Sequence, residues 1–467
     1  MTERLPPEVS SDAAAEPWGP RLWLGVAVVA MAGFLIQSHG ITTWPMADDE
    51  VPSLVEMGLS DIGAEAFSVP PEQVGRLPRA LPVWYGFQQF TIGQLPADET
   101  SYRIPSLIFA LLTSVLVFIV AARWRGLWFA IALSILLNLS PPFVLAAQLN
   151  RFYAMPLFLA SLTLLAIWVP GARAVMLPAV AAGTILTVLS HNITIALFGL
   201  AFGAGFLAVM AGRAPRHVLE RTALALAVSA IVYIGYLRPI VSGWSSTGNP
   251  TPILVSYAAH LGVPALALAL LGAALVLLDG ARARAMGWWL VIFAGSFGVF
   301  LVAQFNFNPR YFLFFFTAAW VLGAYAATEV ARRLGHGPAG AAWYACVALL
   351  LLPSLFSHYQ DGSRHDYRQA AAVLTSQARG SQPLLSDDAE TIGYYLAPEL
   401  RRRLVVRTKA REYPAGEFFL VARMNAWMPQ PTVPGRRVDV IAEISRRRFD
   451  QFSHVLRVYR VAAQDVH

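Results

Sequence analysis

Charged side chains are scarce in this chain, because only 13% of its 467 residues are Asp, Glu, Lys or Arg. A soluble domain usually carries about 25%. Hydrophobic residues make up 56%, and lysine occurs once, at Lys409, so that the basic charge is otherwise all arginine. This composition argues against a soluble enzyme and indicates a chain that lies mostly in a membrane.

Cysteine is almost absent as well. The single residue, Cys346, lies in an apolar run, so that an intramolecular disulfide and a zinc site built on cysteines are both excluded. The net charge of +7 could point to nucleic acid. Its arginines, however, lie in short loops between apolar runs, which is the pattern of membrane topology, and we expect no nucleic-acid partner.

Long apolar runs are abundant. A membrane-spanning helix needs about 20 apolar residues. By that measure the sequence predicts an integral membrane all-α bundle of about eleven transmembrane helices within 22–357, at 22–42, 104–122, 127–146, 154–170, 174–189, 193–211, 222–240, 259–278, 288–305, 311–328 and 341–357. Residues 1–21 are polar and proline-rich, which predicts a disordered cytoplasmic tail and not a cleaved signal peptide.

The arginines predict the orientation of the bundle, because cytoplasmic loops carry an excess of positive charge. The connections that follow even-numbered spans hold ten arginines, at 123, 125, 173, 213, 216, 221, 282, 284, 332 and 333. The short connections on the other side hold only Arg151 and Arg310. We therefore expect the N-terminus inside, and the loops 43–103 and 241–258 and the tail 358–467 outside.

Two outer segments have a character of their own. In the loop 43–103, residues 51–59 and 81–95 mix apolar and polar side chains, which predicts short amphipathic helices in the membrane interface. The tail 358–467 alternates helical and strand-like runs, which predicts a small extracytoplasmic α/β domain. Its expected elements are a helix at 366–379 and strands at 383–386, 403–407, 418–423, 438–444 and 454–461.

The first outer loop begins with three consecutive carboxylates, Asp48, Asp49 and Glu50, which are the candidate catalytic residues. Such a cluster must face water at the membrane surface, and intramembrane or juxtamembrane acids are frequently functional. A carboxylate can accept a proton from an attacking hydroxyl or amine. The alternative interpretation is a solvated loop without a role.

Several basic and aromatic residues fall on the same outer side. Arginine binds phosphate as a bidentate fork, so that a carboxylate base facing arginines suits transfer of a group from a phosphate-activated lipid. Snorkelling of the arginines to lipid headgroups and a hydrogen-bonded turn at His191 are the alternatives. The candidate substrate-binding residues are Arg103, Arg151, Tyr153, His191, Arg310 and Tyr311.

These residues occur in segments that resemble a known family. Trp44 through Leu59, with Asp49-Glu50 matching an Asp-Glu pair after the first span, resembles the first outer loop of GT-C glycosyltransferases of the family 39 type, which include protein O-mannosyltransferases and aminoarabinose transferases. The likeness continues in order along nearly the whole chain, through Tyr102–Ser106, Gln148–Ala154, Ser190-His191, Pro309–Tyr311, Asp366–Arg368 and Tyr394–Leu396.

The resemblance implies a membrane enzyme that transfers a sugar from a polyprenyl-phosphate donor to a glycolipid, polysaccharide or protein at the outer face of the bacterial cytoplasmic membrane. Asp49 would be the general base, and Arg151 and Arg310 would hold the phosphate. No glycine-rich nucleotide loop occurs on the cytoplasmic side, which is consistent with a lipid donor. A non-enzymatic binder or transporter of lipid-linked sugars is the alternative, and product formation by the purified protein would discriminate the two.

The chain departs from the family at two places. Many members have an acidic residue before the arginine of the Arg-Xaa-Tyr element, where this chain has Asn150. Many also have Asp or His before a Pro-Pro-Leu in the first loop, where this chain has the sequence Pro-Arg-Ala-Leu-Pro at 78–82. A divalent metal therefore has no clear second carboxylate to support it, and the sequence assigns no cofactor.

Overall fold

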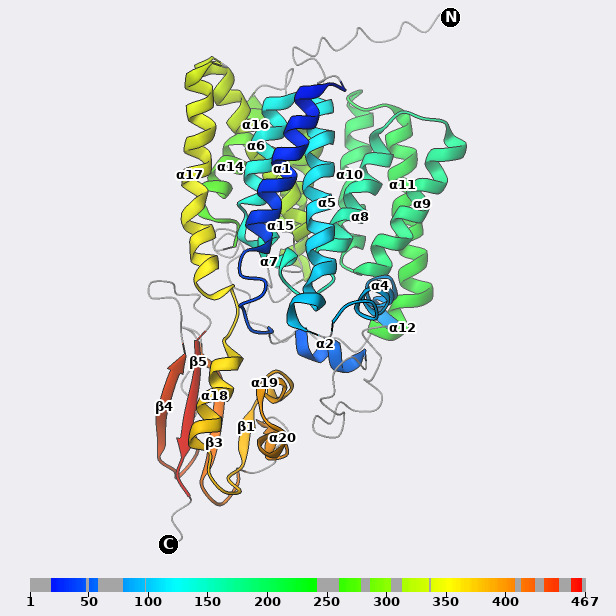
Figure 1. Ribbon diagram of the computed structural model, residues 1–467. Helices are drawn as coiled ribbons and strands as arrows, with labels where there is room; N and C mark the ends of the chain where they lie inside the picture. The colour runs from blue at the N-terminus through cyan, green and yellow to red at the C-terminus, as the bar shows by residue number, and fades with distance from the viewer. Residues whose placement is uncertain are drawn as a thin grey trace, which may run out of the picture.

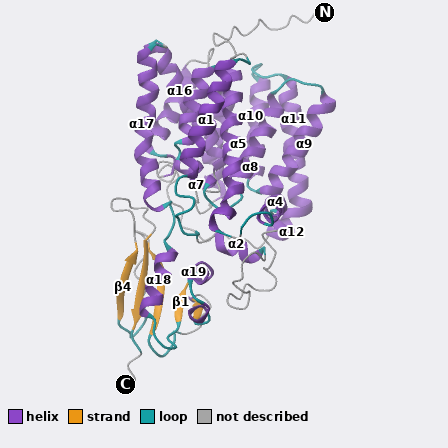
Figure 2. Cartoon of the chain, in the orientation of Figure 1, coloured by secondary structure: helices purple, strands orange, loops and turns teal. Residues whose placement is uncertain are grey.

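A computed structural model describes residues 18–47, 50–57, 79–96, 98–241, 260–278, 286–303, 313–335, 337–407, 413–424, 432–444 and 455–463. Asp48, Asp49, Arg310 and Tyr311 lie outside these ranges. A bundle of long helices forms one part of the molecule, and a small sheet with short helices lies at one end of the bundle (Figures 1 and 2). The described start of the chain lies at the opposite end (Figure 1).

The helices of the bundle follow the apolar runs of the sequence. They are α1 (Pro20–Ser38), α5 (Glu99–Arg125), α6 (Leu127–Asn138), α7 (Pro141–Ala147), α8 (Ala154–Trp168), α9 (Arg173–Ser190), α10 (Thr194–Met210), α11 (Arg216–Val232), the π-helical turn η1 (Tyr233–Leu237), α12 (Arg238–Val241), α14 (Val263–Leu278), α15 (Gly287–Ala303), α16 (Leu313–Leu334) and α17 (Pro338–Asp361).

Each of the eleven predicted spans coincides with one or more of these helices. Within the described residues, six helices are long and apolar enough to cross a membrane, or seven if the bent pair α6 and α7 counts as one span. The apolar helices at Ala154–Trp168, Thr194–Met210, Val263–Leu278 and Gly287–Val299 are shorter. A multi-pass membrane protein is therefore supported, whereas the count of eleven spans is not confirmed.

One predicted span has a different shape in the structure. Residues 127–146 were expected to form a single helix, but α6 and α7 meet at an angle of 70°. Pro141 and Pro142 follow the break. Proline lacks the backbone N–H that continues a helix and restricts the residue before it, and it suits the first turn of a new helix. The bend brings the end of α7 towards the first loop.

Two short helices cover the end of the bundle that carries the sheet. They are α2 (Glu50–Glu56) and α4 (Pro82–Ile92), both in the loop 43–103 (Figure 1). The prediction of short helices at 51–59 and 81–95 is therefore confirmed. Trp84 and Tyr85 of α4 are buried, whereas Phe90 is 70% exposed, so that α4 packs one face on the protein and exposes one aromatic ring.

The C-terminal part forms a five-stranded mixed sheet with the order β2-β1-β3-β5-β4. Strands β1 (Leu384–Ser386), β2 (Leu404–Val406) and β3 (Phe418–Met424) are parallel, whereas β5 (Val455–Val461) is antiparallel to both β3 and β4 (Val438–Ile444). These strands and α18 (Tyr367–Gln377) occur where the sequence predicts them. The remaining helices are α19 (Ala389–Tyr395) and α20 (Pro398–Arg401).

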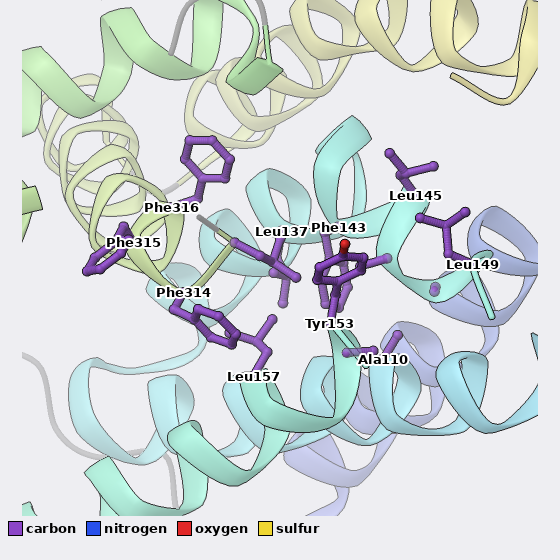
Figure 3. Packing of buried hydrophobic residues seen from close by; sticks show 14 of the residues in the cluster. Ala110, Leu137, Phe143, Leu145, Leu149, Tyr153, Leu157, Phe314, Phe315 and Phe316 are labelled. Atoms are coloured by element: carbon purple, nitrogen blue, oxygen red, sulfur yellow. The ribbon is translucent and has the colours of Figure 1, made fainter. Parts of the chain in front are cut away.

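The core of the bundle lies where α16 meets α6, α7 and α8. Phe314, Phe315 and Phe316 of α16 are fully or nearly fully buried, and Figure 3 shows Phe314 beside Leu157 of α8. The ring of Phe143 in α7 makes an edge contact with Trp320 at 6.1 Å between centroids. This packing fixes α7 and the start of α8, and the residues 148–153 of the candidate site lie between these two helices.

Candidate active site

Glu50 is the centre of a buried charge cluster at the start of α2. Its side chain is fully buried. The carboxylate accepts hydrogen bonds from the backbone N–H groups of Ala47 (2.7 Å) and Asn150 (2.5 Å). It also accepts from Arg103, through Nε and Nη2 at 3.2 Å each, and from Nη1 of Arg364 at 3.3 Å. Five donors from four parts of the chain therefore meet on one carboxylate.

Arg103 comes from the first turns of α5 and is also completely buried. Besides Glu50, its guanidinium donates to the backbone carbonyls of Ile41 (2.8 Å), Trp44 (2.9 Å) and Pro45 (2.9 Å). The five N–H groups of an arginine are thereby used inside the protein. Arg103 therefore stabilises residues 41–45, which lead into the acidic segment Asp48–Glu50. These contacts differ from the substrate contact that the sequence predicts for Arg103.

Arg364, between α17 and α18, is the second cation on Glu50, and both side chains are fully buried. It also donates to the carbonyls of Gly362 (3.1 Å), Pro45 (3.2 Å) and Gln148 (3.3 Å), and its guanidinium lies 5.3 Å from the ring of Trp44. Burial alone would raise the pKa of the Glu50 carboxyl, but the guanidinium groups of Arg103 and Arg364 hold that pKa below its ordinary value. Glu50 is therefore ionised.

Arg151 lies beside this cluster, because the backbone N–H of the preceding Asn150 binds Glu50. Its Nη1 donates to Oγ of Ser53 in α2, and its guanidinium lies 4.8 Å from the ring of Phe152. Only 7% of the residue is exposed. The hydroxyl of Tyr85 in α4 donates to the same Ser53 Oγ at 3.4 Å. The Arg151 guanidinium is thus a further cation in contact with α2, the helix that starts with Glu50.

His191 and Tyr153 are buried near Arg151. The ring of His191 makes edge contacts with Phe152 at 4.7 Å and Phe314 at 5.6 Å. Its Nδ1 accepts from the N–H of Ile193 at 3.2 Å. Burial and the nearby Arg151 lower the pKa of His191 to about 3, so that the imidazole is neutral at physiological pH. Tyr153 is fully buried and packs among apolar side chains (Figure 3).

A second set of contacts joins the C-terminal part to the same loop. The Tyr395 hydroxyl, at the end of α19, accepts from the N–H of Met46 at 2.6 Å and donates to Glu99 Oε1 at 2.9 Å. Arg368 of α18 donates to Glu99 Oε2 at 2.7 Å and to the carbonyl of Thr43 at 3.1 Å. Burial and the Glu99 carboxylate raise the pKa of the Tyr395 hydroxyl, which therefore stays protonated.

The structure thus brings Glu50, Arg103 and Arg151 together, with His191 and Tyr153 on the inner side of Arg151. The sequence-predicted residues Asp48, Asp49, Arg310 and Tyr311 lie outside the described residues, and their roles stay predictions. Sequence reasoning missed Arg364, although its place as the first arginine after the last apolar run was a signal. Within the described ranges, no three His, Cys, Asp or Glu side chains are placed to hold a metal ion.

Comparison with known proteins identifies the class of fold. No protein-family model and no curated protein matches the sequence. Solved structures do match, and their fold is that of the GT-C membrane glycosyltransferases, as the sequence resemblance predicts.

Among these structures is ArnT from Cupriavidus metallidurans, which matches with a TM-score of 0.55 and 15% identity over 94% of this chain and 97% of that chain. ArnT bound to undecaprenyl phosphate matches with a TM-score of 0.54 and 15% identity over 95% and 98%. The oligosaccharyltransferase AglB from Archaeoglobus fulgidus, in complex with an inhibitory peptide and a dolichol-phosphate, matches with a TM-score of 0.54 and 13% identity. That match covers 84% of this chain and 65% of the AglB chain.

Proposed function

We propose that this protein is a membrane glycosyltransferase that transfers a sugar from a polyprenyl-phosphate donor to an acceptor at the outer face of the bacterial cytoplasmic membrane. The observation that carries the proposal is the acidic segment that ends at the buried Glu50, with Arg151 beside it, in a chain with the GT-C fold. ArnT has been solved with undecaprenyl phosphate, which supports a polyprenyl-phosphate ligand for this fold.

The proposed reaction is a direct displacement at the anomeric carbon. An acceptor hydroxyl or amine attacks that carbon, the bond between the carbon and the phosphate oxygen breaks, and polyprenyl phosphate leaves. Asp49 accepts the proton of the acceptor group, because it fills the first position of the Asp-Glu pair. The reaction needs no redox partner, and proton transfer by such a base typically contributes about 10²–10⁴ in rate.

In this proposal the neighbouring residues have distinct roles. Glu50 and Arg103 hold the acidic segment in place, since their polar groups bind each other and backbone groups of residues 41–47. Arg151 and Arg310 bind the donor phosphate, with bidentate geometry that suits an arginine. His191, which is neutral, and Tyr153 line the inner side of Arg151.

The test uses the product that every polyprenyl-phosphate donor releases. Purified protein in nanodiscs is incubated with synthetic polyprenyl-phosphate hexoses and pentoses and with a lipid and cell-envelope extract as acceptor source. Mass spectrometry then measures free polyprenyl phosphate and mass-shifted acceptors. We expect release of polyprenyl phosphate from at least one donor, in proportion to glycosylated product. Binding of the donors without any release would favour a non-enzymatic binder or transporter instead.

A further inference from the structure

We propose that the C-terminal part of the chain fixes residues 45–47 and Glu50, which flank the proposed base in the sequence, with Arg364 and Tyr395 as positioning residues. This inference rests on the proposed function for its effect on the reaction, but its structural part can be measured without any activity. Neither residue is among the candidate site residues of the sequence. Both belong to the region after α17, more than 300 residues beyond the segment that they contact.

Arg364 holds the segment at its C-terminal end. Its Nη1 contacts both the carbonyl of Pro45 (3.2 Å) and Oε2 of Glu50 (3.3 Å), so that one guanidinium joins the two ends of residues 45–50. Its Nη2 donates to the carbonyl of Gln148 after α7. Because Arg364 lies between α17 and α18, it ties the segment to the start of the C-terminal part and to the bundle at once.

Tyr395 holds the segment at its N-terminal end. Its hydroxyl accepts the N–H of Met46 at 2.6 Å and is itself fixed by Glu99. Arg368 binds the same Glu99, and its guanidinium lies 5.5 Å from the Tyr395 ring. The helix α19 lies beside α2, whereas α18 lies in front of the strands in the view of Figure 1. The N–H that Tyr395 binds precedes Asp48 and Asp49 in the chain, and the carboxylate that Arg364 binds follows them.

The residues that Arg364 and Tyr395 contact are also joined by hydrogen bonds between Ala47 and Glu50. The N–H of Glu50 donates to the carbonyl of Ala47 at 3.1 Å, and the N–H of Ala47 donates to Glu50 Oε2 at 2.7 Å. The same Oε2 receives Arg364. Loss of Arg364 or of the Tyr395 hydroxyl would therefore loosen the residues on both sides of the proposed base, and displacement of a catalytic group by about 1 Å can cost about 10² in rate.

The experiment compares Arg364→Gln and Tyr395→Phe with the wild-type protein in nanodiscs. Tyr395→Phe removes one oxygen atom and serves as the decisive variant if Arg364→Gln does not fold. The matched controls are Arg457→Gln, whose partner Glu443 lies on the far strand β4, and Tyr413→Phe, whose ring stacks on Phe418. Hydrogen exchange of the peptide 43–50 is measured together with undecaprenyl phosphate affinity and the kcat of polyprenyl phosphate release.

We expect exchange of the peptide 43–50 to rise at least about tenfold in both variants. Tyr395→Phe removes the acceptor of the Met46 N–H, and Arg364→Gln removes a cation that holds the Glu50 carboxylate, which accepts the N–H of Ala47. We expect kcat to fall about tenfold or more with the undecaprenyl phosphate affinity unchanged. The controls should match wild type. Unchanged exchange overturns the inference, as does raised exchange with wild-type kcat. If wild-type protein releases no polyprenyl phosphate, the proposed function fails, and the exchange result alone decides whether the C-terminal part fixes the segment.

Discussion

The carboxylate of Glu50 is ionised in a place from which water is excluded. Two guanidinium groups and two backbone N–H groups replace the water that it loses. Such a buried pair adds little net stability compared with apolar residues, but removing one partner leaves an uncompensated charge and typically costs about 3–5 kcal/mol. The cluster therefore serves mainly to fix Glu50 and the backbone of residues 44–47, and it contributes little net stability.

Glu50→Gln should destabilise the protein by about 3–5 kcal/mol at neutral pH, because Arg103 and Arg364 then share no anion. The folded-state pKa of Glu50 is lowered, so that its contribution is present above the ordinary carboxyl pKa and is lost as pH falls through the folded value. The difference between wild type and variant should therefore shrink in acid. Unfolding in detergent, monitored at neutral pH and at pH values below the ordinary pKa of a glutamate, measures it.

The control for this variant is Glu443→Gln, since the pair of Glu443 with Arg457 is half exposed and such pairs contribute at most about 1 kcal/mol. A Glu50→Gln protein as stable as wild type at neutral pH would contradict the assignment of a buried, ionised cluster.

Arg151→Lys and Arg310→Lys test the proposed phosphate site. A lysine offers only a point charge where arginine offers a planar fork, so we expect each variant to bind undecaprenyl phosphate about tenfold more weakly. Titration of the protein in nanodiscs, followed by tryptophan fluorescence, measures the affinity. The control is Arg173→Lys, whose side chain is 77% exposed at the start of α9. Wild-type affinity in both test variants would leave these arginines as headgroup anchors.

Part of this site could be predicted from the residues alone. Charged residues are scarce in this sequence, so that those next to the predicted spans, Glu50, Arg103 and Arg151 among them, could be singled out. Their partners could not be predicted, because Arg103 binds backbone carbonyls, and any sequence provides those. Arg364 could not be paired with Glu50, because the contact spans 314 residues and depends on how α17 ends beside α7.

At the scale of elements, apolar length and turn residues predicted most of the secondary structure. The strands of the tail follow from short β-branched and aromatic runs. The helix α18 begins directly after Asp366, whose carboxylate caps it by accepting the N–H of Gln369. The division of residues 127–146 into α6 and α7 was missed. The hydropathy of this run does not indicate a bend. The pair Pro141-Pro142 was the available signal.

Close helix packing gives a prediction at this scale. A Cβ atom added at Gly272 of α14 would lie 2.0 Å from the backbone carbonyl oxygen of Leu322 in α16. Gly272→Ala should therefore push these helices apart and destabilise the protein by about 1–3 kcal/mol. Gly199→Ala in α10, where a Cβ would meet nothing within 4 Å, is the matched control. Thermal unfolding of both variants decides, and equal melting temperatures would contradict the α14–α16 contact.

At the scale of the whole molecule, α2, α4 and the C-terminal sheet gather at one end of the bundle, and the described start of α1 lies at the other (Figure 1). The arginine distribution predicts that the end with the sheet is extracytoplasmic. A reporter that works only in the cytoplasm should therefore be silent when it is fused after His467. The same reporter fused before Met1 is the control and should be active. Activity of the C-terminal fusion would reverse the topology.

The central claim is that the protein transfers a sugar from a polyprenyl-phosphate donor with a general base from the acidic segment. Its most direct test is the rate of polyprenyl phosphate release by wild type and by Asp49→Asn, which keeps the shape of the side chain and removes its charge. The account predicts that the variant still binds undecaprenyl phosphate and releases product about 10²–10⁴ times more slowly. Release at the wild-type rate would contradict the assignment of Asp49 as the base and direct the search to Asp48.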